Sequence, residues 1–204
     1  MRVRTHTNPF QYRYEVEPLE LADITSHYQD LDLEIGFGRG AFLRNWAINQ
    51  PNRFIIGAEI RKQMVDILQD RVNKQELKNT LLFHGSGEQL LEFGLPEKSI
   101  ARIYVFHPDP WFKKRHHKRR VINSDSLKKM TKVLKPKGRL YISTDVQELW
   151  EAMRETICNS NLFQEIDDND FWETQYTTHW EAFSERDSRP QMMSTFEKSN
   201  PKLY

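Results

Sequence analysis

Cysteine is nearly absent from this sequence of 204 residues, in which Cys158 is the only one. A single cysteine excludes an internal disulfide and a metal site built from several thiolates. Because Cys158 lies in a helix-like segment, we expect it to pack in the structure rather than to react. A reducing compartment suits such a chain.

Long apolar runs are also missing from the sequence. Residues 1–9 contain no apolar core of the kind found in signal peptides, and no later stretch reaches the length of a membrane span. We therefore expect a cytoplasmic protein with no membrane partner.

Net charge is small as well, because 30 Lys and Arg residues nearly balance 29 Asp and Glu residues to leave +1. Any affinity for nucleic acid must then come from the distribution of charge along the chain. The 38% of hydrophobic residues suffice for one core. We expect a single domain over residues 1–204 with a short N-terminal extension of about residues 1–28.

Short apolar runs alternate with longer helix-like segments along the chain, a pattern typical of a mostly parallel sheet covered by helices on both faces. The fold class is therefore α/β. Helices are expected over 41–49 and 146–158, with another around Val65, Leu68 and Val72. Closing antiparallel strands are expected near Phe163, Trp172, Tyr176, Trp180 and Phe183. The expected inner strands are Asp32–Ile35, Arg53–Glu59, Thr80–Phe83, Ile100–Phe106 and Arg139–Thr144.

The first chemical motif is a glycine-rich turn between a strand and a helix, which lets the backbone approach a ligand closely. Its candidate cofactor-binding residues are Gly36, Gly38 and Gly40. The turn also satisfies the dinucleotide fingerprint, so the glycines alone do not choose the cofactor. Glu34, just before the turn, would repel a pyrophosphate but favour the positive charge of S-adenosylmethionine. Glu59, at the end of the next strand, suits a ribose in either case. The alternatives are an N-cap partner or surface acid at the turn for Glu34, and a helix-entry carboxylate for Glu59.

Ser86 follows the third expected strand and precedes a helix. A serine at this position caps a helix on backbone grounds alone, so capping is at least as good an interpretation as a contact with adenine.

The segment Pro108-Asp109-Pro110-Trp111 follows the fourth expected strand, at the edge where open α/β sheets bind ligands. The two prolines restrict the loop and lower the entropy lost in fixing its side chains. Asp109 is our first candidate for a residue at the reacting atoms, with a turn-capping acid as the alternative. Trp111 is equally well interpreted as a base-stacking residue or as a hydrophobic anchor.

A dense run of cationic side chains comes directly after this loop. Its six Lys and Arg residues are suited to several phosphates and would make affinity fall steeply with salt. A solvated charged helix start is the alternative. A metal site made from His107, Asp109 and the two histidines of the run is disfavoured by the surrounding cations. The run comprises Lys113, Lys114, Arg115, His116, His117, Lys118, Arg119 and Arg120.

These residues together resemble the tRNA (guanine-N7)-methyltransferases, especially the single-chain bacterial kind. The resemblance extends from about Leu31 to Lys198, and Pro108 to Arg120 is its most specific element. It implies a Rossmann-like class I methyltransferase fold with S-adenosylmethionine as cofactor and tRNA as partner. The order of the acids follows the family arrangement: Glu34, Glu59, Asp109 and Asp145.

The resemblance also implies roles for individual residues. Glu34, Glu59 and Ser86 would line the cofactor pocket, and Asp109 would lie between the methyl donor and the guanine. Lys113 and Asp145 would touch the substrate. Contacts with the tRNA would come from Arg115, His116, His117, Lys118, Arg119 and Arg120. A C-terminal tetrad that closes over the guanine would comprise Ser194, Thr195, Phe196 and Glu197.

Three positions depart from the family pattern. Ser86 stands where bacterial relatives usually have aspartate, Phe112 replaces a common proline, and Ser194-Thr195 replaces a Thr-Lys pair. The expected activity is methyl transfer to N7 of a guanine in the variable loop of tRNA, with no obligate protein partner. A nicotinamide-dependent oxidoreductase and a non-catalytic RNA-binding module remain as alternatives.

Overall fold

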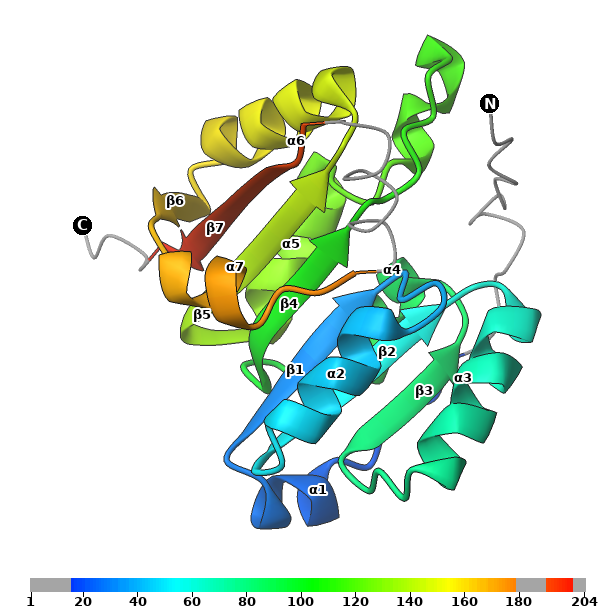
Figure 1. Ribbon diagram of the computed structural model, residues 1–204. Helices are drawn as coiled ribbons and strands as arrows, with labels where there is room; N and C mark the ends of the chain where they lie inside the picture. Colours follow the sequence, from blue (N-terminus) through cyan, green and yellow to red (C-terminus); the bar gives the residue numbers. More distant parts are fainter. Residues whose placement is uncertain (1–15, 179–189, 200–204) are drawn as a thin grey trace.

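The computed structural model describes residues 16–178 and 190–199, whose strands form one seven-stranded sheet (Figure 1). The strand order is β3-β2-β1-β4-β5-β7-β6. Strands β1 to β5 pair in parallel, and β7 runs antiparallel to both β5 and β6. The predicted mostly parallel α/β sheet is confirmed. The strands are β1 Asp30–Ile35, β2 Arg53–Glu59, β3 Thr80–His84, β4 Ile100–Phe106, β5 Leu134–Thr144, β6 Phe163–Ile166 and β7 Met192–Lys198.

Helices cover both faces of this sheet (Figure 1). Helices α2, α3 and α7 pack an aromatic-rich cluster against one face, and α5 and α6 pack an aliphatic cluster against the other. The helices are α1 Ala22–His27, α2 Ala41–Asn49, α3 Lys62–Lys74, α4 Gly87–Gln89, α5 Ser124–Val133, α6 Gln147–Asn159 and α7 Asn169–Thr174, with single-turn segments η2 Leu90–Gly94 and η3 Lys114–Arg119.

Strand β1 shows how the sequence pattern places the site. Successive side chains of a strand point to opposite faces of the sheet. Leu31, Leu33 and Ile35 therefore enter the aliphatic cluster, while the alternate residues of β1 are all carboxylates facing the side of α2. Two of them, Asp32 and Glu34, are buried.

Asn123 fixes the point where α5 begins, immediately after the cationic run. Its side chain accepts hydrogen bonds from the backbone N–H groups of Asp125 and Ser126, and the Ser126 hydroxyl accepts one from the Asn123 N–H. This reciprocal cap satisfies free donors of the first helical turn. The Asn123 amide also donates to the carbonyl of Arg120 at 3.0 Å, which ties the cationic run to the start of α5.

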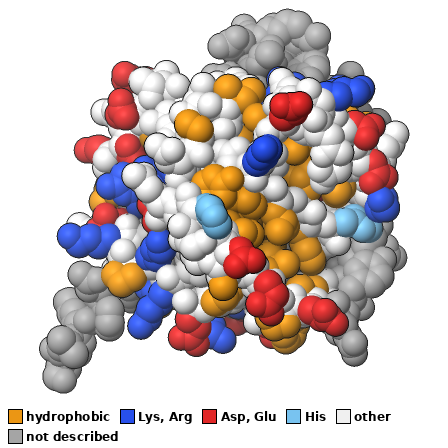
Figure 2. All heavy atoms as spheres, turned by 90° about the horizontal axis from the view of Figure 1, so that it is seen from below, with side chains coloured by type: hydrophobic (Ala, Val, Ile, Leu, Met, Phe, Trp, Pro, Cys, Tyr) orange, Lys and Arg blue, Asp and Glu red, His pale blue; other side chains and the backbone are white. Residues whose placement is uncertain are grey.

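The face on which the strands begin has mixed charge. Figure 2 shows it from below, with acidic and basic side chains around a central group of hydrophobic ones. The segment η3, green at the top of Figure 1, lies at the opposite end, where the parallel strands finish. No helix within residues 16–178 and 190–199 has the length and apolar character needed to cross a bilayer.

Two expectations about the C-terminal part are wrong. Cys158 lies in helix α6 as predicted, but it is exposed and does not pack in the core. Trp172 belongs to the short helix α7 instead of a strand, and Tyr176 follows that helix outside any strand, whereas Phe163 begins β6 as expected. Trp180 and Phe183 lie outside the described residues.

Candidate functional site

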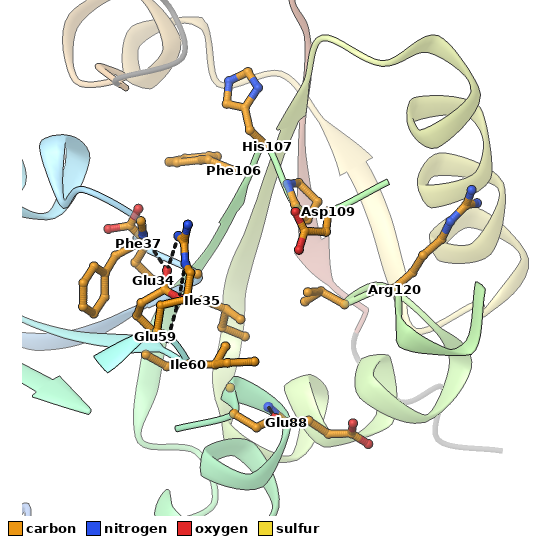
Figure 3. Close-up of a pocket in the computed structure, with 18 of the residues that line it drawn as sticks. Glu34, Ile35, Phe37, Glu59, Ile60, Glu88, Phe106, His107, Asp109 and Arg120 are labelled. Atoms are coloured by element: carbon orange, nitrogen blue, oxygen red, sulfur yellow. Dashed lines mark hydrogen bonds and ion pairs between the residues drawn. The ribbon is translucent and has the colours of Figure 1, made fainter. Parts of the chain in front are cut away.

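A cavity of about 380 Å³ opens at the carboxyl ends of β1, β2, β3 and β4 (Figure 3). Parallel strands finish at the same edge of a sheet, so residues that follow them meet there although they are far apart in sequence. Carboxylates and cationic side chains share the lining of this cavity. Among the predicted site residues it brings together Glu34, Gly36, Gly38, Glu59, Ser86, Asp109, Lys118, Arg119 and Arg120.

The glycine turn forms one wall of the cavity, and its glycines differ in role. All three have a positive φ, which favours glycine because other side chains are strained there. A Cβ on Gly36 would meet nothing within 4 Å, so the backbone here is open to a ligand. A Cβ on Gly40 would lie 2.3 Å from the side chain of Leu68 in α3. Gly40 does not line the cavity, and its structural role is close packing of helices.

Glu34 is buried at the end of β1, with only 3% of its surface exposed. Burial raises the pKa of Glu34 to about 8, and the charge of Glu59 adds to the rise, while a hydrogen bond from the Leu43 backbone opposes it. The Glu34 Oε2 atom has no hydrogen-bond partner among the residues that the structure describes. A buried oxygen without a partner is costly, and a cationic ligand in the cavity would remove that cost.

Glu59, at the end of β2, is buried but fully hydrogen-bonded. Its Oε2 accepts from the Gly38 N–H at 2.9 Å and from Arg61 Nη2 at 2.9 Å. Its Oε1 accepts from the N–H and the Nε of Arg61 at 3.0 and 2.9 Å. A carboxylate has about four acceptor positions, so all are used. The Arg61 side chain is 43% exposed, so it can turn toward solvent. A ligand hydroxyl can then donate to Glu59 in place of the guanidinium.

Ser86 lies after β3 and caps the short helix that follows, because its hydroxyl accepts from the Glu88 N–H at 3.3 Å. The same residue is buried and lines the cavity. The capping role expected from the sequence is therefore present, and a contact with a ligand stays a prediction.

The loop after β4 is fixed by its neighbours. Arg120 Nε donates to the Pro110 carbonyl at 2.9 Å, and its Nη2 forms an ion pair with Glu148 of α6 at 3.1 Å. The guanidinium carbon of Arg119 lies 5.1 Å from the centre of the Trp111 ring, and the ring of His116 meets that of Trp111 edge-on. Trp111 is thus an anchor of the loop that also lines the cavity, so the anchoring role is present and a contact with a base stays a prediction.

Asp109 lies within this held loop and lines the cavity (Figure 3). The charge of Asp109 acts on Arg61, contributing to a raised pKa of that guanidinium after the hydrogen bonds of Glu59 and despite burial. Asp109 and the Glu59–Arg61 pair therefore line the same cavity and influence each other by charge, and the role of Asp109 at the reacting atoms stays a prediction.

The cationic run contains exposed, half-buried and buried residues, with His116, His117 and Arg119 half-buried. Lys113, Lys114, Arg115 and Lys118 are exposed and available to phosphates. Arg120 differs because it is buried and bonded to the protein. Its contact with RNA stays a prediction, whereas its contact with Pro110 is a structural fact.

Asp145 does not line the cavity but lies behind it. Its Oδ1 is 3.5 Å from His107 Nδ1, and both side chains are 1% exposed. His107 Nε2 and the Ser143 hydroxyl each lie 2.9 Å from the Tyr176 hydroxyl. This buried polar group supports the start of the Pro108 loop, which the sequence did not reveal because Tyr176 is 69 residues from His107.

The C-terminal tetrad lies in β7, away from the cavity. The Ser194 hydroxyl donates to Glu165 at 2.7 Å, and Thr195 accepts from the Trp172 indole at 2.9 Å. Phe196 is fully buried, and Glu197 lies 3.9 Å from Arg139. None of the four lines the cavity at the strand ends, whereas Ser194 and Thr195 line a second cavity beside Glu165 and Trp172. Closure over a base therefore stays a prediction.

Comparisons with known proteins agree with this arrangement. The family model Methyltransf_4, described as "Putative methyltransferase", matches residues 29–196. A tRNA (guanine-N(7)-)-methyltransferase of Shewanella amazonensis is 32% identical over 155 residues, which are 76% of this chain and 65% of that protein. One of Shewanella baltica is 36% identical over 71% of this chain and 60% of that protein. The chain thus spans 60% to 65% of the length of these relatives.

In two further comparisons, this chain matches a larger share of the other protein's length. A tRNA (guanine-N(7)-)-methyltransferase of Prochlorococcus marinus is 33% identical over 83% of this chain and 84% of that protein. Among solved structures, the 16S rRNA methyltransferase KamB superposes with a TM-score of 0.67 at 16% identity, over 92% of this chain and 96% of that chain. A likeness at this level of identity shows a shared fold.

Proposed function

This chain belongs to the tRNA (guanine-N7)-methyltransferase family, and we propose that it transfers a methyl group from S-adenosylmethionine to N7 of a guanine in tRNA. One observation carries the proposal: carboxylates suited to a cationic cofactor and cations suited to a polyanion line the same cavity. The variable loop is the proposed target within the tRNA, by resemblance to the family.

The residues of the cavity fit S-adenosylmethionine. The unpartnered Oε2 of Glu34 suits a positive charge, and the open backbone at Gly36 suits a close approach. Glu59 is proposed to hold the ribose hydroxyls after Arg61 swings outward, and Gly38 and Ser86 line the same wall. When bound, the cofactor supplies an electrophilic methyl group on a sulfonium.

Positioning is the main task of the protein in this reaction. Guanine N7 already carries an in-plane lone pair, so its attack requires no prior removal of a proton. A correctly aligned complex gains the orientation advantage of a unimolecular step. The product guanine carries a positive charge, which a fixed carboxylate stabilises. Asp109 is suited to this role because it lines the cavity in a loop held by Arg120.

Base selection is proposed to use the same carboxylate. A carboxylate accepts hydrogen bonds from the guanine N1–H and amino group, and adenine has no matching pair of donors on that edge. Asp109 is better placed for this than Asp145, whose carboxylate lies behind the cavity at 3.5 Å from His107. Asp145 and His107 are proposed to position the loop that carries Asp109.

Nuclease digestion and mass analysis of tRNA, after incubation with the protein and S-adenosylmethionine, test the proposal. We expect 7-methylguanosine in the digest and its loss with Asp109→Ala, provided that this variant still binds S-adenosylhomocysteine. Transfer at the wild-type rate by folded Asp109→Ala would refute the role of Asp109. Binding of NAD in place of S-adenosylhomocysteine would favour an oxidoreductase, and tRNA binding without transfer would favour a non-catalytic module.

A further inference from the structure

Phe112 is strongly exposed next to the cavity. Its exposed fraction is 61%, larger than that of any other hydrophobic side chain that the structure describes as exposed. It is followed directly by Lys113, Lys114 and Arg115, which are also exposed. A single exposed ring is ordinary on a protein surface, but this one lies between the lining of the cavity and a run of exposed cations.

Phe112 and its neighbour Trp111 have different roles. Trp111 is only 9% exposed, and the Arg119 guanidinium and the His116 ring cover it at 5.1 and 5.8 Å between centres. Most of the Trp111 ring is therefore covered by protein groups, although it also lines the cavity. The aromatic face that this loop presents outward belongs to Phe112.

The loop that carries Phe112 is held in place before any ligand arrives. Pro108 and Pro110 restrict its backbone, and Arg120 binds the Pro110 carbonyl at 2.9 Å while pairing with Glu148 at 3.1 Å. A side chain on a pre-ordered loop loses less entropy on binding than one on a mobile loop. The backbone that leads into Phe112 is thus held in place by Arg120.

We propose that Phe112 is a stacking surface for an unpaired base of the tRNA, next to the guanine that enters the cavity. This inference rests on the proposed function. Trp111 lines the cavity, and consecutive Cα atoms are about 3.8 Å apart, so Phe112 lies at its rim. The planar faces of all four bases stack on an aromatic ring, and the three following cations suit the adjoining phosphates.

Binding of the full-length protein to an unmodified tRNA transcript, measured over a range of salt concentrations, tests the inference. We expect Phe112→Ala to weaken binding roughly 5- to 150-fold, the range for losing one stacked base. Phe112→Trp should bind like the wild type, and Phe112→Leu, which keeps the apolar bulk without an aromatic face, should resemble Phe112→Ala. Phe93→Ala is the matched control, because Phe93 is 52% exposed elsewhere and should not affect binding.

The salt dependence separates stacking from phosphate contacts. Phe112→Ala should leave the slope of log affinity against log salt unchanged, whereas Lys114→Ala should reduce its magnitude by about 1. Unchanged tRNA affinity in Phe112→Ala, or equal affinities of the Leu and Trp variants, would overturn the inference. Should Phe112→Ala also lose S-adenosylhomocysteine, the Leu and Trp variants decide, because both retain a bulky side chain.

The outcomes also separate this inference from the proposed function. Wild-type protein that methylates tRNA, with a Phe112→Ala variant that binds it equally well, would end the inference alone. Wild-type protein that binds tRNA but transfers no methyl group would end the proposed function, and stacking would still be decided by the binding series. Wild-type protein that binds no tRNA would end both.

Discussion

Strand β1 carries two buried carboxylates, Asp32 and Glu34, on the same face, and their surroundings differ. Asp32, near the start, accepts hydrogen bonds from Arg53 Nε and Nη2 at 2.9 and 2.7 Å and from the Trp46 indole at 3.0 Å. Glu34, at the end, has an Oε2 without a partner among the described residues. Both are buried, with 0% and 3% exposed. Burial therefore does not separate a structural acid from a binding acid, but hydrogen-bond satisfaction does.

The electrostatics of the two acids reflect this difference. Burial lowers the pKa of Arg53, but the hydrogen bonds and charge of Asp32 outweigh it and raise the pKa overall. Burial also raises the pKa of Asp32, although its hydrogen bonds and ion pair with Arg53 oppose that rise. Burial and Glu59 raise the pKa of Glu34 to about 8, so Glu34 is mostly neutral at pH 7 until a cation enters the cavity. The two acids therefore share the direction of the pKa shift and differ in that, within the described part of the chain, only Asp32 has a bonded cation.

Asp32→Asn should have the largest effect on stability. Removing one partner of a buried ion pair leaves the other charge uncompensated, which costs about 3–5 kcal/mol of unfolding free energy. The retained bond from Arg53 to Asp30 at 2.8 Å favours the lower end. Denaturant-induced unfolding measures the change. A loss below about 1 kcal/mol would show that the pair is not buried as described, and Asp32→Leu with Arg53→Met should recover most of the stability.

Glu34→Gln should change the unfolding free energy less than Asp32→Asn does, and it should stabilise the protein at high pH. The folded-state pKa of about 8 exceeds the ordinary value of 4.5, so the wild-type protein loses stability as pH rises from 4.5 to 8. Glutamine is not ionised, so this variant should be more stable than wild type by roughly 1–4 kcal/mol at pH 9 and little changed at pH 5. Unfolding at both pH values tests this, and a variant less stable than wild type at pH 9 would contradict it.

The affinity for S-adenosylmethionine should depend on pH through the same group. Between pH 6 and 8, a cationic ligand must displace the proton of Glu34, so affinity should rise by up to about tenfold per pH unit and then level off. Titration calorimetry in buffers of different ionisation enthalpy should detect proton release at pH 7. Glu34→Gln should bind more weakly with a flat profile, and a flat profile in wild type would refute the assignment.

The inner part of the fold was predictable from the sequence because its strands and helices carry clear patterns. Strands β2 and β4 and helix α2 have the predicted bounds. The start of β5 was missed, since Leu134–Gly138 contains two lysines, a proline and a glycine and looks like a loop. Helix α7 was missed because six residues are too few to show a helical period.

The site was predictable where chemistry follows from position at a strand end. Glu34, Glu59 and Asp109 were expected at one edge of a parallel sheet, and all three line the cavity. Roles set by contacts between distant elements were not predictable. Gly40 packs against Leu68 of α3, and Arg120 turns inward to Pro110, although each belongs to a motif that predicts a ligand.

Lys135→Met, in β5, removes a partner of Asp30, the more exposed carboxylate at the start of β1, and should have the smallest effect on stability. Asp30 lies on the face of Asp32 and Glu34, and its Oδ1 is 2.6 Å from Lys135 Nζ, with the two side chains 30% and 38% exposed. Burial alone would raise the pKa of Asp30, but Lys135 and Arg53 together lower it. Solvent and salt screen such a pair, so the loss should stay below about 1 kcal/mol and shrink further at high salt.

The pH dependence of stability gives a separate test that the Asp30–Lys135 pair is stabilising. Because the folded-state pKa of Asp30 is lowered, the stability it contributes is present above its ordinary value of 3.8 and is lost as pH falls through the folded value. The difference between wild type and Lys135→Met should therefore vanish in acid. A loss of about 2 kcal/mol or more at pH 7 would mean that exposure to solvent does not weaken the Asp30–Lys135 ion pair. The contribution of each carboxylate of β1 to the unfolding free energy would then depend on ion pairing alone and not on burial.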